Sequence, residues 1–202
     1  MAEYLKLGLV GWLWCIAGMA TAGTVSVQVK DAAGKPLADA IVFLDSAAAR
    51  AAVRPAQGAE IAQASRQFVP TVSVVPVGGS VLFPNRDTVR HHVYSFSPAK
   101  TFELKLYTGT PANPVLFDKP GVVILGCNIH DHMIAWVLVV ETPYYGKTNA
   151  EGMLALPGVA PGSYRLRTWH SALPVGAVPQ DQALAVGAAD TTVNVALKVA
   201  AP

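Results

Sequence analysis

Short apolar runs separated by turn residues are the feature that most constrains how this chain can fold. Between Phe68 and Glu141 these runs are rich in valine, leucine and aromatic residues, and Gly78-Gly79 and Pro84-Asn85-Arg86-Asp87 are among the turn segments. Regular short strands with such punctuation are typical of a sandwich or a Greek-key barrel. Strands are expected over residues 71–77, 80–83, 91–96, 102–107, 121–125 and 134–141. The sequence therefore predicts an all-β chain without a long amphipathic helix.

The same strand pattern flanks this segment on both sides. Val25 to Val29 alternates apolar and polar residues, and an apolar run from Ala40 to Leu44 follows a turn. Near the C-terminus, strands are expected at residues 153–156, 164–169, 183–186 and 191–199. Residues 47–64 are rich in alanine and fit a loop or one short helix. The flanking strands predict a second, small β unit.

The N-terminal segment, residues 1–22, predicts a cleaved signal peptide. Lys6 precedes an apolar run from Leu7 to Met19, and Ala20-Thr21-Ala22 has the small-residue form of a cleavage site. The run is shorter than the ~20 residues that a spanning helix needs, and glycines interrupt it. We therefore expect an exported, periplasmic protein with no membrane span after cleavage.

The charge of the chain argues against a nucleic-acid partner. Only 14% of the residues are charged and the net charge is +2, so no basic field is present to attract a polyanion. We expect protein partners instead.

Cys127 is the only cysteine left after cleavage, because Cys15 lies in the signal peptide. A single thiol forms no internal disulfide, although export takes it to an oxidising compartment. Three interpretations are open for it: a buried inert thiol, a catalytic nucleophile or a metal thiolate. The nucleophile lacks a clear orienting carboxylate, since Asp131 points elsewhere on an extended loop.

The residues after Cys127 favour the metal. The spacing C-x-x-H-x-x-M places a thiolate, the His130 imidazole and the Met133 thioether on one loop between two strands. His91, at the mouth of an expected strand, can supply a fourth ligand. A His₂Cys plane with a weak axial methionine suits copper, whereas structural zinc prefers four strong ligands. Core packing is the alternative role for Met133.

Two further histidines leave the coordination open. His91 and His92 are adjacent, and successive strand residues point to opposite faces, so only one of them faces a metal in a regular strand; we expect His91. His132 is expected to be exposed near the metal, with an alternative ligand role open. Arg86, Asp87 and Arg90 are expected to be turn-surface charges, with partner selection as the functional alternative.

Residues 68–140 resemble the cupredoxins, most closely those of the amicyanin and plastocyanin type. The C-x-x-H-x-x-M loop and the run from Asn85 to His91 carry the resemblance. It implies a cupredoxin-like Greek-key sandwich holding one copper per chain, cycling between Cu(I) and Cu(II), on His91, Cys127, His130 and Met133. It also implies that Asn85 steadies the ligand loops. His92 and His132 depart from the amicyanin pattern.

The flanking segments resemble a different family, the carboxypeptidase-regulatory-like β-sandwich of immunoglobulin-like type. Residues 23–44, the segment Asn149 to Leu156 and the run Gly162-Ser163-Tyr164-Arg165-Leu166 carry this resemblance. It implies a small sandwich split into residues 23–46 and 147–200, with the copper domain, residues 60–142, inserted or packed between the two parts.

Together these features predict a periplasmic type 1 copper protein that transfers single electrons between redox partner proteins and is not an enzyme. Two alternatives remain open at this level. The same ligands fit copper delivery or sequestration, with His92 and His132 assisting exchange. An adhesion or carbohydrate-binding sandwich with a structural metal is the other.

Overall fold

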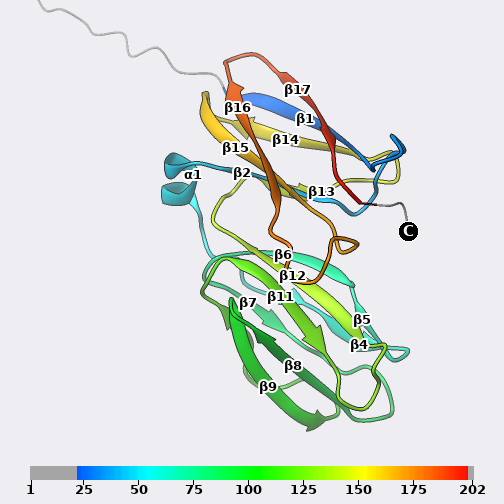
Figure 1. Cartoon of the computed structure of the whole chain (residues 1–202). Coiled ribbons are helices and arrows are strands. Elements are labelled where there is room, and N and C mark those ends of the chain that lie inside the picture. Colours follow the sequence, from blue (N-terminus) through cyan, green and yellow to red (C-terminus); the bar gives the residue numbers. More distant parts are fainter. Residues whose placement is uncertain (1–21, 200–202) are drawn as a thin grey trace, which may run out of the picture.

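The computed structural model describes residues 22–199, so the predicted signal peptide, apart from Ala22, lies outside the described residues. Strands form nearly all of the regular structure, and the prediction of an all-β chain is confirmed (Figure 1). The short helix α1 (Ala47–Ala52) begins after Ser46, whose hydroxyl accepts a hydrogen bond from the Ala49 amide. Among residues 22–199, no helix has the length and hydropathy needed to cross a bilayer.

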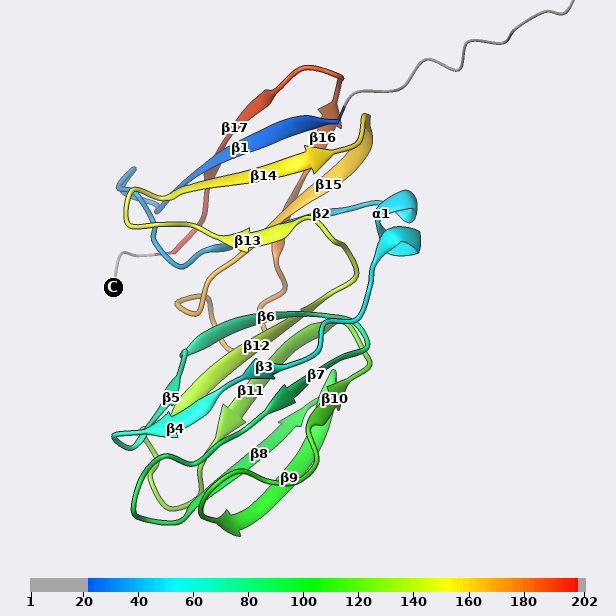
Figure 2. The same cartoon turned by 180° about the vertical axis from the view of Figure 1, so that it is seen from behind.

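The strands form two units, one above the other in Figures 1 and 2. In the first unit, one sheet has the order β14-β1-β17, with β14 (Met153–Val159), β1 (Gly23–Lys30) and β17 (Thr191–Ala196). Its second sheet has the order β13-β2-β15-β16, with β13 (Tyr145–Lys147), β2 (Ile41–Asp45), β15 (Gly162–Trp169) and β16 (Gln180–Val186). An aliphatic core that includes Val27, Leu44 and Leu166 lies between these sheets.

The second unit is formed by the chain between β2 and β13. Its five-stranded sheet has the order β6-β12-β11-β8-β9, with β6 (Val72–Pro76), β12 (Ile134–Val140), β11 (Gly121–Gly126), β8 (His91–Ser97) and β9 (Lys100–Tyr107). A smaller sheet has the order β10-β7-β3, with β10 (Val115–Phe117), β7 (Gly79–Leu82) and β3 (Ala59–Glu60). The hairpin of β4 (Ala62–Ala64) and β5 (Gln67–Val69) forms a separate two-stranded sheet.

The apolar clusters show that the sheets of the two units, apart from the β4–β5 hairpin, pack in layers. On β12, Ala135 and Val137 belong to the core of the second unit, whereas Leu138 and Val140 pack against β2 and β15 of the first unit. On β2, Phe43 faces this junction and Leu44 faces the core of the first unit. Both strands are buried on both faces, which is why both read as continuous apolar runs in the sequence.

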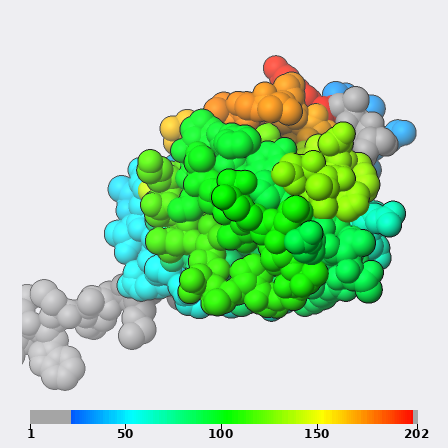
Figure 3. Space-filling view, turned by 90° about the horizontal axis from the view of Figure 1, so that it is seen from below, coloured from blue at the N-terminus to red at the C-terminus, as the bar shows by residue number. Residues whose placement is uncertain are grey.

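The hairpin of β11 and β12 determines where the candidate ligands lie. Its register runs from Gly121 opposite Val139 to Gly126 opposite Ile134, so residues 127–133 are the loop that closes it. β8 pairs with β11 through Tyr94 opposite Gly126, and His91 is its first residue. The start of β8 and the closing loop therefore lie at the same end of the sheet. Seen from below (Figure 3), the second unit, mostly green, covers most of the face, and the orange segment that follows β15 lies along its upper edge.

Candidate metal centre

The loop from Cys127 to Met133 is folded by its own backbone. The Met133 amide donates a hydrogen bond to the His130 carbonyl at 2.9 Å, and the Ile134 amide donates one to the His132 carbonyl at 3.0 Å. Gly126 precedes the loop, and a side chain there would place its Cβ 2.7 Å from the Tyr94 ring. A larger residue directly before Cys127 would therefore displace the end of the Tyr94 side chain.

His91 and His92 point to opposite faces of the sheet. His91 is wholly buried, as are Val93 and Ser95 on the same face of β8. His92 lies on the other face, where its Nε2 is 2.8 Å from a carboxylate oxygen of Glu103. His91 is thus directed toward the core of the second unit and His92 away from it, in a part of β8 where the pairing with β9 shifts register between His91 and Val93.

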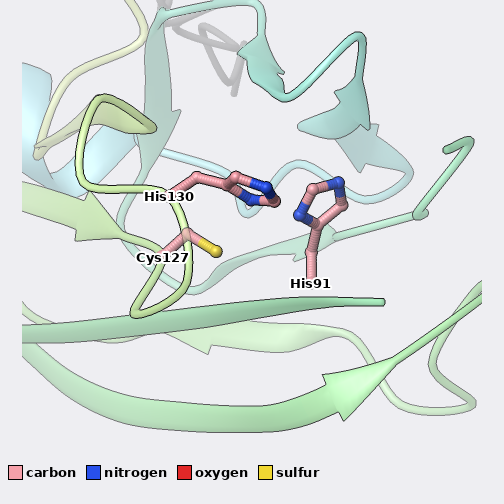
Figure 4. Close-up of side chains that lie close together, drawn as sticks. All are labelled: His91, Cys127 and His130. Atoms are coloured by element: carbon pink, nitrogen blue, oxygen red, sulfur yellow. The ribbon is translucent and has the colours of Figure 1, made fainter. Parts of the chain in front are cut away.

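His91, Cys127 and His130 come together in one group. Each offers a ligand atom, and these three atoms lie within 4.8 Å of one another. Figure 4 shows Cys127 and His130 on one loop and His91 on a separate segment, with the sulfur and the imidazoles turned toward a common space. The two imidazole centroids are 5.1 Å apart. Cys127 is 3% exposed and His130 is half-buried, so one edge of the group reaches the surface.

The unpaired nitrogens of this group fit a metal ion. Nδ1 of His91 and Nδ1 of His130 are buried and have no hydrogen-bond partner among the described residues. A buried polar atom without a partner costs about 1–3 kcal/mol, and a metal bound between the two rings removes that cost. Two imidazoles and a thiol are donors for zinc, copper or iron rather than for magnesium or calcium. The three side chains therefore can hold a transition metal.

Asp87 fixes the orientation of His91. Its Oδ2 lies 2.7 Å from Nε2 of His91, so Nδ1 is the nitrogen left to bind a metal. A carboxylate on the far nitrogen of a ligating histidine orients the ring and raises its basicity. The expectation that Asp87 is a turn-surface charge is wrong, because its side chain is only 16% exposed and is held by His91.

The β4–β5 hairpin holds Asp87 in turn. The Ser65 amide donates to Oδ1 of Asp87 at 2.7 Å, and the Arg66 amide donates to Oδ2 at 2.9 Å. Burial alone would raise the pKa of Asp87, but the hydrogen bonds from Arg66, His91 and Ser65 outweigh it and lower the pKa. Ser65 and Arg66 both have left-handed backbone, with φ of 52° and 56°, which directs their amides at the carboxylate.

The surroundings of His130 favour its neutral imidazole. Burial lowers the pKa of His130, and the neighbouring His91, Arg66 and His132 lower it further, against a smaller opposing effect of Asp87. A neutral imidazole is the form that binds a metal. The lowered pKa of His130 therefore favours the form that can bind a metal.

The other predicted site residues lie around the group in different roles. Met133 is 1% exposed and shares the apolar cluster of Cys127. His132 is exposed, its Nε2 lies 3.1 Å from the Arg66 carbonyl, and its ring centroid is 5.9 Å from that of His130. The amide of Asn85 donates to the carbonyls of Val89 and Tyr107, so it braces the segment that leads to His91.

A groove flanks the group on the cysteine side. It has a volume of about 600 Å³, and Cys127 and Met133 are among its lining residues. Val175 and Gly176, from the segment that follows β15, also line it. Part of the first unit therefore lies beside the candidate metal centre.

Comparison with known proteins finds similarity at the level of solved structures. No protein-family model matches the chain, and no curated protein sequence matches it significantly. A purple cupredoxin from Nitrosopumilus maritimus is 22% identical, with a TM-score of 0.36; the match covers 41% of this chain and all of that one. A reduced tryptophan-to-tyrosine variant of amicyanin is 20% identical, with a TM-score of 0.37; the match covers 49% of this chain and 98% of that one.

A copper-containing nitrite reductase from Thermus scotoductus is also similar. It is 23% identical, with a TM-score of 0.38; the match covers 43% of this chain and 22% of the reductase. This chain therefore spans less than a quarter of the reductase. All three matches are at low identity and cover less than half of this chain.

Two residues at the centre were not singled out as site residues from the sequence. Asp87 lies four residues before His91, but no spacing rule connects an acid in a turn to the far nitrogen of a histidine. Gln63 lies in an alanine-rich stretch without a strand pattern, and its side chain is wholly buried. Both owe their position to the β4–β5 hairpin, which the sequence did not predict.

Proposed function

We propose that this protein is a periplasmic type 1 copper protein that transfers one electron at a time between redox partners, without substrate turnover. The observation that supports this most is the group of His91, Cys127 and His130, whose ligand atoms lie within 4.8 Å of one another. A trigonal His₂Cys set is the arrangement of blue-copper electron-transfer sites. The expected load is one copper per chain.

Met133 supports copper over zinc as the metal. It follows His130 by three residues, is buried in the apolar cluster of Cys127 and lines the same groove as that cysteine. A thioether is a soft donor that favours copper, whereas structural zinc prefers four strong ligands. We assign Met133 as the weak axial ligand.

The chain's own residues hold the ligands in place for a rapid change of charge. Copper, when bound, supplies the Cu(I)/Cu(II) couple. His91 is fixed through Asp87 and the β4–β5 hairpin, and the ligand loop is fixed by its backbone hydrogen bonds. Ligands held by packing and by surrounding hydrogen bonds keep their geometry, which lowers the reorganisation needed for electron transfer. His130, the half-buried ligand, offers the path to a partner.

The periplasmic location rests on the N-terminal sequence, where Lys6, the apolar run and Ala20-Thr21-Ala22 form the pattern of an export signal. It is tested by comparing the N-terminus of the protein recovered from a periplasmic extract with that of the translated chain. Cleavage after Ala22 is expected, and an intact N-terminus on a cytoplasmic protein would contradict the location.

Copper delivery is a second candidate, favoured by one observation. The exposed His132 ring lies 5.9 Å from that of His130, so a metal leaving the group meets another imidazole at the surface. In that case the centre exchanges copper rather than electrons.

Voltammetry and metal transfer separate the two functions. For electron transfer, the copper-loaded protein gives a reversible one-electron wave and retains copper in the presence of a Cu(I) chelator. Rapid copper loss to the chelator, abolished by His132→Ala but not by the matched His92→Ala, would favour delivery. Retention of copper without a reversible wave would contradict both functions and favour a structural metal.

A further inference from the structure

Gln63 is a buried amide with unused hydrogen-bonding capacity. Its side chain is 0% exposed, and neither Oε1 nor Nε2 has a hydrogen-bond partner among the described residues. An amide in that position costs stability, and an apolar side chain of similar size would avoid the cost. A role outside the fold itself explains why an amide rather than a leucine or methionine lies there.

The backbone directs this amide into the core that contains the metal ligands. Gln63 lies directly opposite Phe68 in the antiparallel β4–β5 hairpin, so both side chains leave the same face. Phe68 belongs to the buried cluster that includes Cys127 and Met133. The Gln63 side chain therefore enters the cluster of the ligands, while Ala62 and Ala64 face away from it.

The main chain holds Gln63 beside the segment that leads to His91. The backbone N–H of Gln63 donates to the Pro84 carbonyl, and its backbone carbonyl accepts from the backbone N–H of Arg86, each at 2.8 Å. Asn85, between those two residues, forms a β-bridge with Gln63. The position of Gln63 relative to the ligand segment is thus fixed by three adjacent backbone contacts.

Tyr107 links the segment beside Gln63 to His91. It lies opposite His91 in the β8–β9 pair, and its hydroxyl donates to the Phe83 carbonyl at 2.6 Å. Burial raises the pKa of Tyr107. Asn85, which forms the β-bridge with Gln63, donates a side-chain hydrogen bond to the Tyr107 carbonyl, so the Gln63 segment lies close to the strand position of His91.

A thiolate at Cys127 is stabilised by hydrogen-bond donors, and the side chain of Gln63 carries two N–H donors. Metal binding requires the thiol to lose its proton, which places negative charge on sulfur within an apolar cluster. Charge in such surroundings is stabilised by hydrogen-bond donors, and the two N–H groups of Gln63 are unused donors on the same side of the core. Hydrogen bonds around the cysteine sulfur also tune the potential of blue-copper sites.

We propose that the Gln63 amide is a positioning and tuning group of the metal centre that donates an N–H hydrogen bond to the Cys127 thiolate when copper is bound. This inference rests on the proposed function, because it requires copper on Cys127. It adds a residue from the β4–β5 hairpin, outside the C-x-x-H-x-x-M loop and the β8 strand. The same hairpin fixes His91 through Asp87, so it contacts the centre in two ways.

The test is Gln63→Met, which keeps the side-chain length and removes the amide. An N–H donor draws charge from the thiolate and favours Cu(I), so its loss favours Cu(II). We expect the ratio of Cu(II) to Cu(I) affinity to rise about tenfold, which is a fall of about 59 mV in reduction potential. The thiolate-to-copper absorption band should shift with it. Gln67→Met, on the outer face of the same hairpin, is the matched control and should change neither.

Stability of the copper-free protein gives a second readout. Because the amide is unpaired without metal, Gln63→Met should leave the urea midpoint of the copper-free protein unchanged or raise it. A purely structural glutamine predicts the reverse, a lower midpoint with an unchanged potential. Gln63→Leu repeats both measurements with a different apolar shape.

Each other outcome overturns the proposal. A higher potential in Gln63→Met would indicate that the amide oxygen is a metal ligand. An unchanged potential, or failure of both Gln63 variants to fold, would show that the amide serves the fold. These results differ from failure of the proposed function, in which the unaltered protein itself forms no thiolate-to-copper band and gives no reversible wave.

Discussion

The two units of this protein place their buried polar side chains differently. In the first unit they close turns: Oδ1 of Asp31 accepts from the amides of Ala33 and Lys35, and the Thr148 hydroxyl bonds to the backbone of Leu37 and Ala40. Both units contain buried polar atoms without a hydrogen-bond partner: they lie on Asp31, Arg167 and Thr168 in the first unit and on Gln63, His91, His92 and His130 in the second. Among the described residues, however, His91 and His130 of the second unit come together with Cys127 in a group that could hold a metal.

This difference indicates that metal chemistry depends mainly on the second unit, whereas the core of the first unit contributes mainly to stability. The core of the first unit is almost wholly aliphatic apart from Tyr164, so its side chains contribute through burial. The core of the second unit has a thiol and a thioether among its buried residues. Changes in the core of the first unit should therefore alter the free energy of unfolding without altering metal affinity. Changes around the ligands of the second unit should alter metal affinity more than the stability of the copper-free protein.

The largest expected effect on stability is in the first unit. Leu166→Ala empties a 1% exposed position in its core and should lower the free energy of unfolding by about 2–5 kcal/mol. Copper affinity, measured at a temperature where the variant is folded, should be unchanged. Urea unfolding and competition with a copper chelator measure the two quantities. A parallel fall in copper affinity would contradict this separation of roles, because the first unit would then influence the metal site.

Copper should stabilise the second unit selectively. At free copper about a thousand times the dissociation constant, binding adds about 4 kcal/mol to the stability of the state that binds it. Hydrogen exchange followed by mass spectrometry should show greater protection in β8, β11 and β12 than in β1, β14 and β17. Equal protection of both units would mean that they unfold together and that the junction at Leu138 and Phe43 couples them fully.

Asp87→Asn should weaken the site by a smaller amount. The substitution removes the carboxylate that orients His91, and loss of such a partner costs about 10- to 100-fold in metal affinity. Asp118→Asn is the matched control, because Asp118 is an exposed aspartate paired with Lys100. Chelator competition measures both variants. If both retain full affinity, the aspartate does not orient His91 for metal binding.

The smallest expected effect is on the pH dependence of stability, and it involves a histidine of the first unit. Burial lowers the pKa of His170, in the first unit, below the ordinary value of about 6.5. As the pH falls, His170 therefore takes up a proton in the unfolded chain before it does so in the folded protein. The folded protein keeps its full stability above about pH 6.5 and loses part of it as the pH falls toward the lower pKa that His170 has in the folded state. Urea unfolding of the copper-free protein at pH 7.5 and 5.5 should show a smaller difference in His170→Gln. An identical difference would exclude His170 as a source of acid sensitivity.

The sequence predicted the parts of the molecule that depend on local pattern. The apolar runs of β2 and β12 marked strands buried on both faces, and the period of two along β8 distinguished His91 from His92. The ligand loop was visible because its three donors lie within seven residues.

The remaining parts depend on contacts that local pattern does not encode. β3, β4 and β5 are two or three residues long and lie in or beside an alanine-rich stretch, so no periodicity marked them. The roles of Asp87 and Gln63 arise only when this hairpin folds over the start of β8, a contact between segments more than twenty residues apart. Pairing at that distance is determined by packing of the whole unit.

The most direct measurement is the visible absorption spectrum of the mature protein loaded with Cu(II), compared with Cys127→Ser. We expect an intense band near ~600 nm from thiolate-to-copper charge transfer, absent from the variant. We also expect Cys127→Ser to remain folded, because the change is small and the two units have separate cores. A colourless protein that binds zinc or Cu(I) instead, or a band that persists in the variant, would contradict the account.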